Sequence, residues 1–178
     1  MKKLESLEQA NEITAVRLSE KRQIAKVGDL FRYSPQAGIY GWGRLIKRGG
    51  FFRMGFDLNL VYIYDAWGET KPSPELLTPR NLLIGPIIVN NLGWSRGYWQ
   101  IVEREPPLSE DILKRHIFIS FGGRGPKDFI YVDEAGDKVY WPSVIKDPLS
   151  QSGIANFNLV DWTVRGILTE RGILKDPA

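Results

Sequence analysis

The 178-residue sequence contains no cysteine and a single histidine, His116. The absence of cysteine excludes a disulfide scaffold, a thiolate metal site, a cysteine nucleophile and a redox motif. One histidine without cysteine excludes a His-rich metal cluster. No apolar run approaches the roughly 20 residues that a membrane-spanning helix needs, and the polar start of the chain lacks the apolar core of a secretory signal. We therefore expect a soluble, cytoplasmic protein.

The chain also lacks a strong excess of either charge. Lys and Arg number 24 and Asp and Glu number 21, which gives a net charge of +3. Acidic residues are interspersed almost everywhere, whereas a nucleic-acid-binding protein usually gathers its basic residues into a patch or stripe. The pattern favours a solvated mixed surface over a nucleic-acid partner. With 43% hydrophobic and 25% charged residues, the composition is that of an ordinary globular domain.

Helices are expected at both ends of the chain. Residues 1–25 contain no Gly or Pro and many good helix formers, which predicts an N-terminal helical extension. Residues 26–178 are expected to form a single domain that ends in a helix over 153–172. Ser152 is suited to cap this helix, and Gly172 is suited to the position just past its end.

Between these helices, short β-rich segments alternate with turns. The segments are dense in β-branched and aromatic residues, and most are joined by short links typical of hairpins. They include residues 30–33, 39–46, 59–65, 98–102 and 129–132. Single helical turns are expected after Ser73 or Thr78, whereas 90–97 is expected to be a polar connection. The pattern predicts an α+β fold, with a curled, mostly antiparallel sheet of about seven short strands and helices at the ends.

Few side chains are placed for catalysis. A general base needs an oriented partner and a nearby substrate, so the interpretation favoured for His116 is a surface or strand-edge histidine. Asp133 and Glu134 occupy a hairpin tip and are expected to serve the turn. Asp65 follows an apolar strand, and a structural ion pair is favoured there over catalysis. The candidate donors to Asp65 are Arg44 and Arg96.

Side chains suited to binding a partner are more frequent. Trp, Tyr and Arg anchor protein interfaces, and the chain has six Trp and seven Tyr residues. Many of them fall in expected strands, where packing explains them, but two tryptophans lie in Gly-bearing connections. The Gly-rich run at 122–125 is more typical of a flexible loop than of a phosphate cradle. The candidate partner-binding residues are Trp67, Trp94, Arg96, Arg124 and Lys127.

Several short motifs occur in a characteristic order. Residues 26–31 read KVGDLF and residues 40–45 read YGWGRL. Further pieces follow at 61–65, 97–102 and 139–141. Together they resemble the immunity protein 26 family of bacterial polymorphic-toxin systems, whose pattern opens with a "KxGDxF" strand and a "YGxGR" strand. The resemblance covers about residues 26–141, and Glu103 stands where the pattern often has Gly.

The resemblance implies a cytoplasmic protein that binds and neutralises a cognate toxin, with no cofactor and no catalytic residues. Its binding face is then expected to show exposed aromatic and charged side chains complementary to the partner. Two other interpretations stay open. One is a small β-barrel-like domain that stacks nucleic-acid bases on Tyr and Trp, and the other is a hydrolase that uses Asp65. The absence of any recognised catalytic motif argues against the hydrolase.

Overall fold

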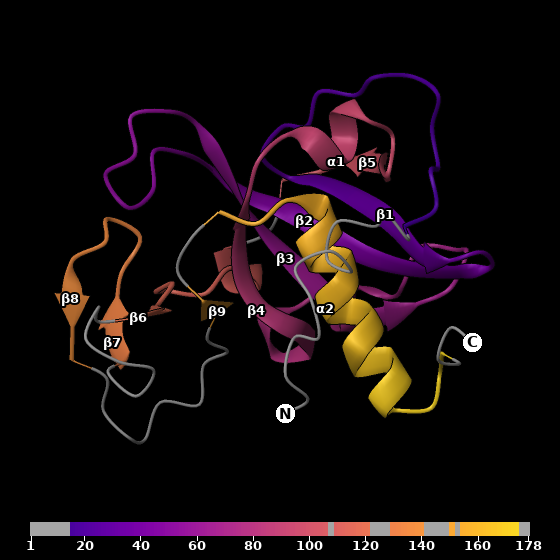
Figure 1. Cartoon of the computed structure of the whole chain (residues 1–178). Coiled ribbons are helices and arrows are strands. Elements are labelled where there is room, and N and C mark those ends of the chain that lie inside the picture. Colours follow the sequence, from indigo (N-terminus) through magenta and orange to yellow (C-terminus); the bar gives the residue numbers. More distant parts are fainter. Residues whose placement is uncertain (1–14, 107–108, 122–128, 141–149, 152–153, 175–178) are drawn as a thin grey trace.

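A five-stranded antiparallel sheet forms the centre of the molecule (Figure 1). The computed structural model describes residues 15–106, 109–121, 129–140, 150–151 and 154–174. The strand order is β4–β3–β2–β1–β5, so β4 and β5 are the two edges of the sheet. The strands are β1 (Asp29–Gln36), β2 (Ile39–Gly49), β3 (Leu58–Trp67), β4 (Leu82–Val89) and β5 (Trp99–Arg104).

A smaller sheet of order β8–β7–β6–β9 accompanies the large one. Its strands are β6 (Phe118–Phe121), β7 (Phe129–Val132), β8 (Lys138–Val139) and β9 (Ser150–Gln151). β6 and β9 pair in parallel, and the other pairs are antiparallel. The α+β class and the mostly antiparallel strand pairing are therefore confirmed, with the strands divided between two sheets.

Register shifts curl the large sheet. Each of its four strand pairs contains at least one shift of the kind that a β-bulge produces. Two glycines of β2 leave room for aromatic rings of the neighbouring strand β1, which lie over them. A Cβ atom at Gly41 would lie 2.5 Å from the ring of Tyr33, and one at Gly43 would lie 2.5 Å from the ring of Phe31. Any larger residue would displace these rings from the core.

Helix α2 (Phe157–Glu170) lies across one face of the large sheet (Figure 1). Its buried apolar residues recur every three or four positions, as an amphipathic helix requires. The Asn156 side chain caps the helix by accepting a hydrogen bond from the Leu159 amide. Gly172 follows the last turn with φ of +70°. The expected C-terminal helix is thus confirmed but begins later than predicted, and Ser152 lies outside the described residues.

Two apolar cores lie on the two faces of the large sheet. The core under α2 contains the stacked rings of Phe31 and Trp99, with Trp94 edge-on to both. The opposite core includes Trp42 from β2 and Phe118 from β6, so it continues into the small sheet. The large sheet is therefore buried on both faces, which explains why β3 reads as an almost unbroken apolar run.

The expected N-terminal helix is not present in the part that the structure describes. Residues 1–14 lie outside that part, and residues 15–25 carry no helix. Their backbone bonds to other segments: the Val16 amide donates to Ser34 O at 2.9 Å, and the Leu18 amide donates to Gly97 O at 2.8 Å. Because tertiary partners satisfy these groups, helix propensity does not decide the conformation.

Short helical turns complete the described chain. A helical turn was expected after Ser73 or Thr78, and the structure has a 3₁₀ turn after each, Pro74–Leu76 and Pro79–Asn81. A third covers Ser109–Asp111. The connection expected at 90–97 contains a one-turn helix, α1 (Leu92–Ser95). None of the helices in the described ranges has the length and apolar character needed to cross a membrane.

Candidate functional site

The single histidine lies in a buried polar junction between the two sheets. His116 Nε2 lies 2.7 Å from the hydroxyl of Tyr62 on β3. His116 Nδ1 lies 2.6 Å from Glu134 Oε1, in the turn between β7 and β8. Lys47 of β2 forms a second ion pair with Glu134. The expectation of a surface or strand-edge histidine was therefore wrong, because His116 is buried.

The charge on Glu134 fixes the direction of its hydrogen bond with His116. The hydrogen bond from His116, assisted by Lys47, outweighs burial and lowers the pKa of Glu134 to about 2. An ionised carboxylate can only accept, so Nδ1 of His116 carries a proton. In the neutral ring, Nε2 then accepts from the Tyr62 hydroxyl, whose oxygen accepts from the Leu113 amide at 2.9 Å.

The two acids of the hairpin tip have different roles. Asp133 serves the turn as expected, since its Oδ1 accepts from the amides of Ala135 and Asp137 at 2.9 Å each. Glu134 does not serve the turn with its side chain, which reaches His116 and Lys47 instead. Both ring nitrogens of His116 are occupied, so the junction holds the sheets together and leaves no ring nitrogen for an external substrate.

Asp65 forms an ion pair, but its partner differs from the prediction. Arg171, at the C-terminal end of α2, donates two hydrogen bonds to the carboxylate, at 2.9 and 2.7 Å. Trp67 Nε1 donates a third at 2.9 Å. Partial burial would raise the pKa of Asp65, but these hydrogen bonds and the charge of Arg171 hold it below its ordinary value. The pair fastens the end of α2 to the end of β3.

Arg44, the partner predicted for Asp65, is buried on another part of the sheet. Its guanidinium donates to Glu105 O at 3.2 Å and contacts Tyr64. Burial raises the pKa of Tyr64, an effect that Arg44 opposes. Arg44 therefore links β2 to the chain that follows β5. The prediction paired Asp65 with the wrong arginine because Arg171 is 106 positions away in the sequence.

The three predicted contact residues that the structure describes do not form one exposed surface. Trp94 is completely buried in the core under α2, so it cannot contact a partner at the surface. Trp67 is half-buried and held by Asp65. Arg96 is exposed at the end of α1. The other two predicted contacts, Arg124 and Lys127, lie outside the described residues.

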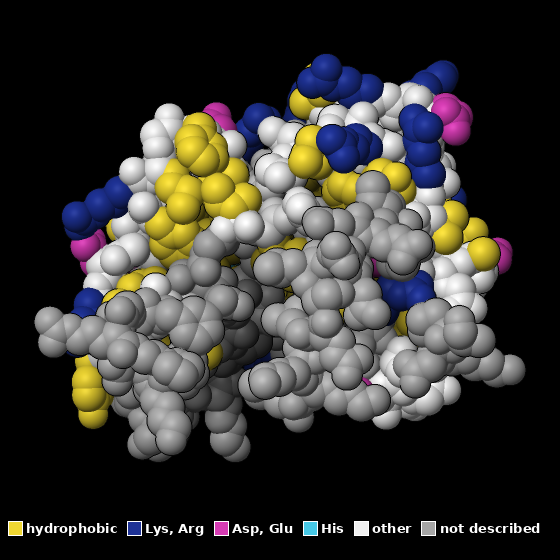
Figure 2. Space-filling model, viewed as in Figure 1, with side chains coloured by type: hydrophobic (Ala, Val, Ile, Leu, Met, Phe, Trp, Pro, Cys, Tyr) yellow, Lys and Arg dark blue, Asp and Glu magenta, His cyan; other side chains and the backbone are white. Residues whose placement is uncertain are grey.

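An exposed cationic surface, missed in the sequence, flanks β5. We call Arg22, Ile24, Lys26, Val102 and Arg104 the β5 surface; all five are exposed and line one groove. Figure 2 shows Lys and Arg side chains gathered in the region where Figure 1 places α1 and the indigo segment 15–25. The sequence does carry a local sign of this cationic surface, because residues 17–26 contain four basic residues and a single acid.

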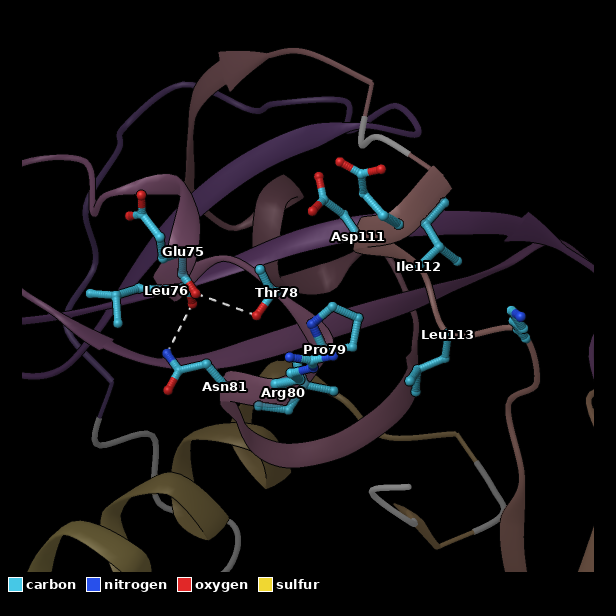
Figure 3. Close-up of a pocket in the computed structure, with 12 residues that line it drawn as sticks. Glu75, Leu76, Thr78, Pro79, Arg80, Asn81, Asp111, Ile112 and Leu113 are labelled. Carbon is cyan, nitrogen blue, oxygen red and sulfur yellow. Dashed lines mark hydrogen bonds between the residues drawn. The ribbon is translucent and has the colours of Figure 1, made fainter. Parts of the chain in front are cut away.

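A second groove, of about 1120 Å³, lies near the 3₁₀ turns (Figure 3). One segment, 75–82, faces another at 110–114, and Thr78 and Asn81 bond to carbonyls of their own segment. Its charges are mixed. The charged lining residues are Glu75, Glu110, Asp111, Arg80 and Lys114.

The family comparison agrees with the motif order. A family model described as Immunity protein 26 matches residues 26–130, more than half of the chain. The protein belongs to the immunity protein 26 family. Neither the comparison with curated proteins nor that with solved structures found a match.

The match to immunity protein 26 covers the whole large sheet and β6, and it ends within β7. The opening motif has a physical role in that sheet. Gly28 has φ of +96°, and a Cβ atom there would lie 2.8 Å from Glu105 O. The Asp29 carboxylate accepts from the Lys26 amide at 2.9 Å. The motif therefore forms a tight turn that starts β1 against the end of β5, while α2 and segment 15–25 lie outside the match.

Proposed function

We propose that this protein neutralises a cognate bacterial toxin in the cytoplasm by binding to it directly, without a cofactor. The observation that carries the proposal is membership of the immunity protein 26 family over residues 26–130. An immunity protein protects the cell that makes or receives the toxin. Stoichiometric binding is the simplest physical route, since it needs only a complementary surface.

The environments of the candidate catalytic groups support binding over catalysis. His116 is buried with both ring nitrogens engaged, and Asp65 is held by Arg171 and Trp67. A general acid or base must reach the proton that it transfers, and neither group does so here. Within the described ranges, no group of three or more His, Asp or Glu side chains is arranged to hold a metal ion.

The test is a titration of a candidate toxin, chosen by sequencing the genes that flank the gene of this protein. Purified protein is added in steps to a fixed amount of this toxin, and the remaining toxin activity is measured. Neutralisation by binding predicts a linear fall that reaches zero at a fixed stoichiometric ratio, and the two chains co-elute in size-exclusion chromatography. Complete inactivation by a small fraction of an equivalent would show enzymatic destruction instead, and undiminished activity would refute the proposal.

A further inference from the structure

The β5 surface has an apolar centre and a cationic rim. It lines a groove of about 670 Å³ beside β5, an edge of the large sheet. At its centre, Ile24 is 65% exposed and Val102 is 47% exposed, while the adjoining Val27 is 51% exposed. Exposed aliphatic side chains rimmed by charge are typical of surfaces that dock a protein partner.

The segment that carries half of this surface is fixed to the large sheet. The Leu18 amide donates to Gly97 O at 2.8 Å, and the Ile101 amide donates to the side chain of Gln23 at 2.7 Å. Gln23 lies between Arg22 and Ile24 in the chain, so its hydrogen bond fixes the part of the segment that carries these two side chains. The surface is therefore ordered before a partner arrives, so that binding costs little conformational entropy.

The positive charge of the surface is largely unneutralised. Of the residues that the structure describes, none forms an ion pair with Arg22 or Lys26. Arg104 Nε lies 3.8 Å from the buried Asp29. The acid in the groove lining, Glu103, is engaged by Lys71 at 2.7 Å. Exposed Lys21 and Arg96 continue the area, and so does Arg17, which pairs with Glu20 at 3.4 Å.

We propose that the β5 surface is the docking site for the toxin, and that the toxin meets it with an acidic face that has an apolar centre. This inference rests on the proposed function and adds the place and the chemistry of the contact. Opposite charges on the two rims steer the encounter and align the partners, while the aliphatic centre supplies affinity through burial.

An acidic protein fits this surface better than the other polyanion, a single-stranded nucleic acid. Proteins that bind single strands without sequence preference combine positive charge with aromatic rings on which bases stack. The tryptophans beside this surface, Trp94 and Trp99, are buried in the core. The exposed apolar groups are aliphatic, so the surface offers charge and apolar area without a stacking platform.

The groove of Figure 3 fits an acidic partner less well. Its lining mixes three acids with two cations, so it presents no potential of one sign. Arg80 and Lys114 are nevertheless exposed cations in that groove. They provide a control with the same change of net charge at a different place on the molecule.

The test is charge reversal of two rim residues. R22E/K26E is compared with the control R80E/K114E for binding to the toxin that the unaltered protein neutralises, by calorimetry at two salt concentrations. We expect the Kd of R22E/K26E to rise at least about tenfold, because like charges then face each other, with little change for the control. The Kd of the unaltered protein should rise with salt, and that of R22E/K26E should respond much less.

The apolar centre is tested separately with Ile24→Asp, using Phe56→Asp as the control. Phe56 is 56% exposed and lies in the connection between β2 and β3. Ile24→Asp should weaken toxin binding and Phe56→Asp should not. Circular dichroism and thermal unfolding identify any variant that fails to fold. If R22E/K26E fails to fold, Arg22→Ala combined with Lys26→Ala replaces it as a milder change.

The outcomes separate this inference from the proposed function. If the unaltered protein binds the toxin and R22E/K26E binds it equally well, the docking site is refuted but the proposed function stands. Loss of binding in R80E/K114E alone would place the contact in the groove of Figure 3. Failure of the unaltered protein to bind the toxin contradicts the proposed function itself. Salt-sensitive binding of a 20-nucleotide poly-dT strand, abolished by R22E/K26E, would overturn the choice of a protein partner.

Discussion

The two sheets are stabilised in different ways. The large sheet is buried on both faces, and the core under α2 contains Phe31, Trp94 and Trp99 in mutual ring contact. The small sheet adds Phe118 and Val132 to the opposite core. Ile130 of β7 packs against the same core, and polar groups add further attachments. The comparison teaches that apolar packing on both faces holds the large sheet, whereas the small sheet combines a smaller apolar contact with hydrogen bonds and ion pairs.

The polar attachment of the small sheet involves the turn between β7 and β8. The Phe52 amide donates to Glu134 O at 2.8 Å, and Arg53 pairs with Asp137. The partly buried contact of His116 with Glu134 involves the same turn. Exposed ion pairs contribute little, so His116 is the side chain whose loss matters most for this attachment. Regions held in this way open locally at a lower free energy than the main core.

The largest effect should come from the aromatic core. Trp94→Ala leaves a cavity among packed rings and should lower the free energy of unfolding by about 3–5 kcal/mol. Urea denaturation followed by circular dichroism measures the change. Trp162→Ala is the matched control, because Trp162 is 48% exposed on α2 and should change stability by less than about 1 kcal/mol. Equal losses in the two variants would contradict the assignment of the core.

The next effect concerns the polar junction. His116→Ala leaves the buried Tyr62 hydroxyl and Glu134 short of a partner, which should cost about 1–3 kcal/mol. Hydrogen exchange should accelerate in β6 and β7 before it does in β2 and β3. Tyr62→Phe keeps the contact of His116 with Glu134 but removes the hydroxyl from His116 Nε2 and the Leu113 amide, so it tests the Tyr62 side of the junction separately. Uniform acceleration over both sheets would show that the junction does not act locally.

Acid should weaken the same junction. The folded pKa of Glu134, about 2, lies below its ordinary value of 4.5. The group therefore stabilises the fold fully above pH 4.5, and this contribution is lost as the pH falls from 4.5 toward 2. Thermal unfolding between pH 7 and pH 2.5 should show a loss that is smaller in Glu134→Gln. An identical acid dependence in the variant would refute this role.

A smaller effect is expected at the start of α2. Asn156→Ala removes the side chain that accepts from the Leu159 amide, and it should cost about 1 kcal/mol. Asn156→Asp keeps an accepting oxygen and should restore most of the stability. Urea denaturation of the three proteins distinguishes the cap from a general effect of the substitution. Equal losses in both variants would show that the cap does not contribute.

The smallest effect belongs to the surface pair that fastens the end of α2. Arg171→Ala removes both hydrogen bonds to Asp65. Both side chains are partly exposed, so the loss should stay below about 1 kcal/mol and shrink at high salt. The control is Arg80→Ala. Arg165→Ala is unsuitable as a control because Arg165 bonds to Pro35 O. A loss that does not depend on salt would indicate lost packing of the arginine stem instead.

The sequence predicted the elements whose pattern is local. The strands of the large sheet are dense in β-branched and aromatic residues, and α2 repeats its apolar residues at helical spacing. A short helical turn was predicted after Ser73 or Thr78, and a 3₁₀ turn follows each of them. Sequence order alone was also enough to recognise the family. In each case neighbouring residues carry the signal.

Other features depended on residues far apart in the chain. Segment 15–25 has good helix formers but bonds instead to β1, to Gly97 and, through the Gln23 side chain, to β5. Trp94 looked like a loop residue but lies completely buried. The β5 surface joins residues 22–26 to residues 101–104, so no local pattern shows that one cluster forms.

The sequence by itself determined the α+β class, the hairpins of the large sheet, the C-terminal helix and the family. Only the tertiary structure decided the partners of Asp65 and His116, the division into two sheets and the position of the cationic surface. The physical reason is the separation in sequence of the residues that interact. Periodicity and turn chemistry act between neighbours, whereas ion pairs and buried hydrogen bonds form between whichever side chains the packed sheets bring within about 3 Å.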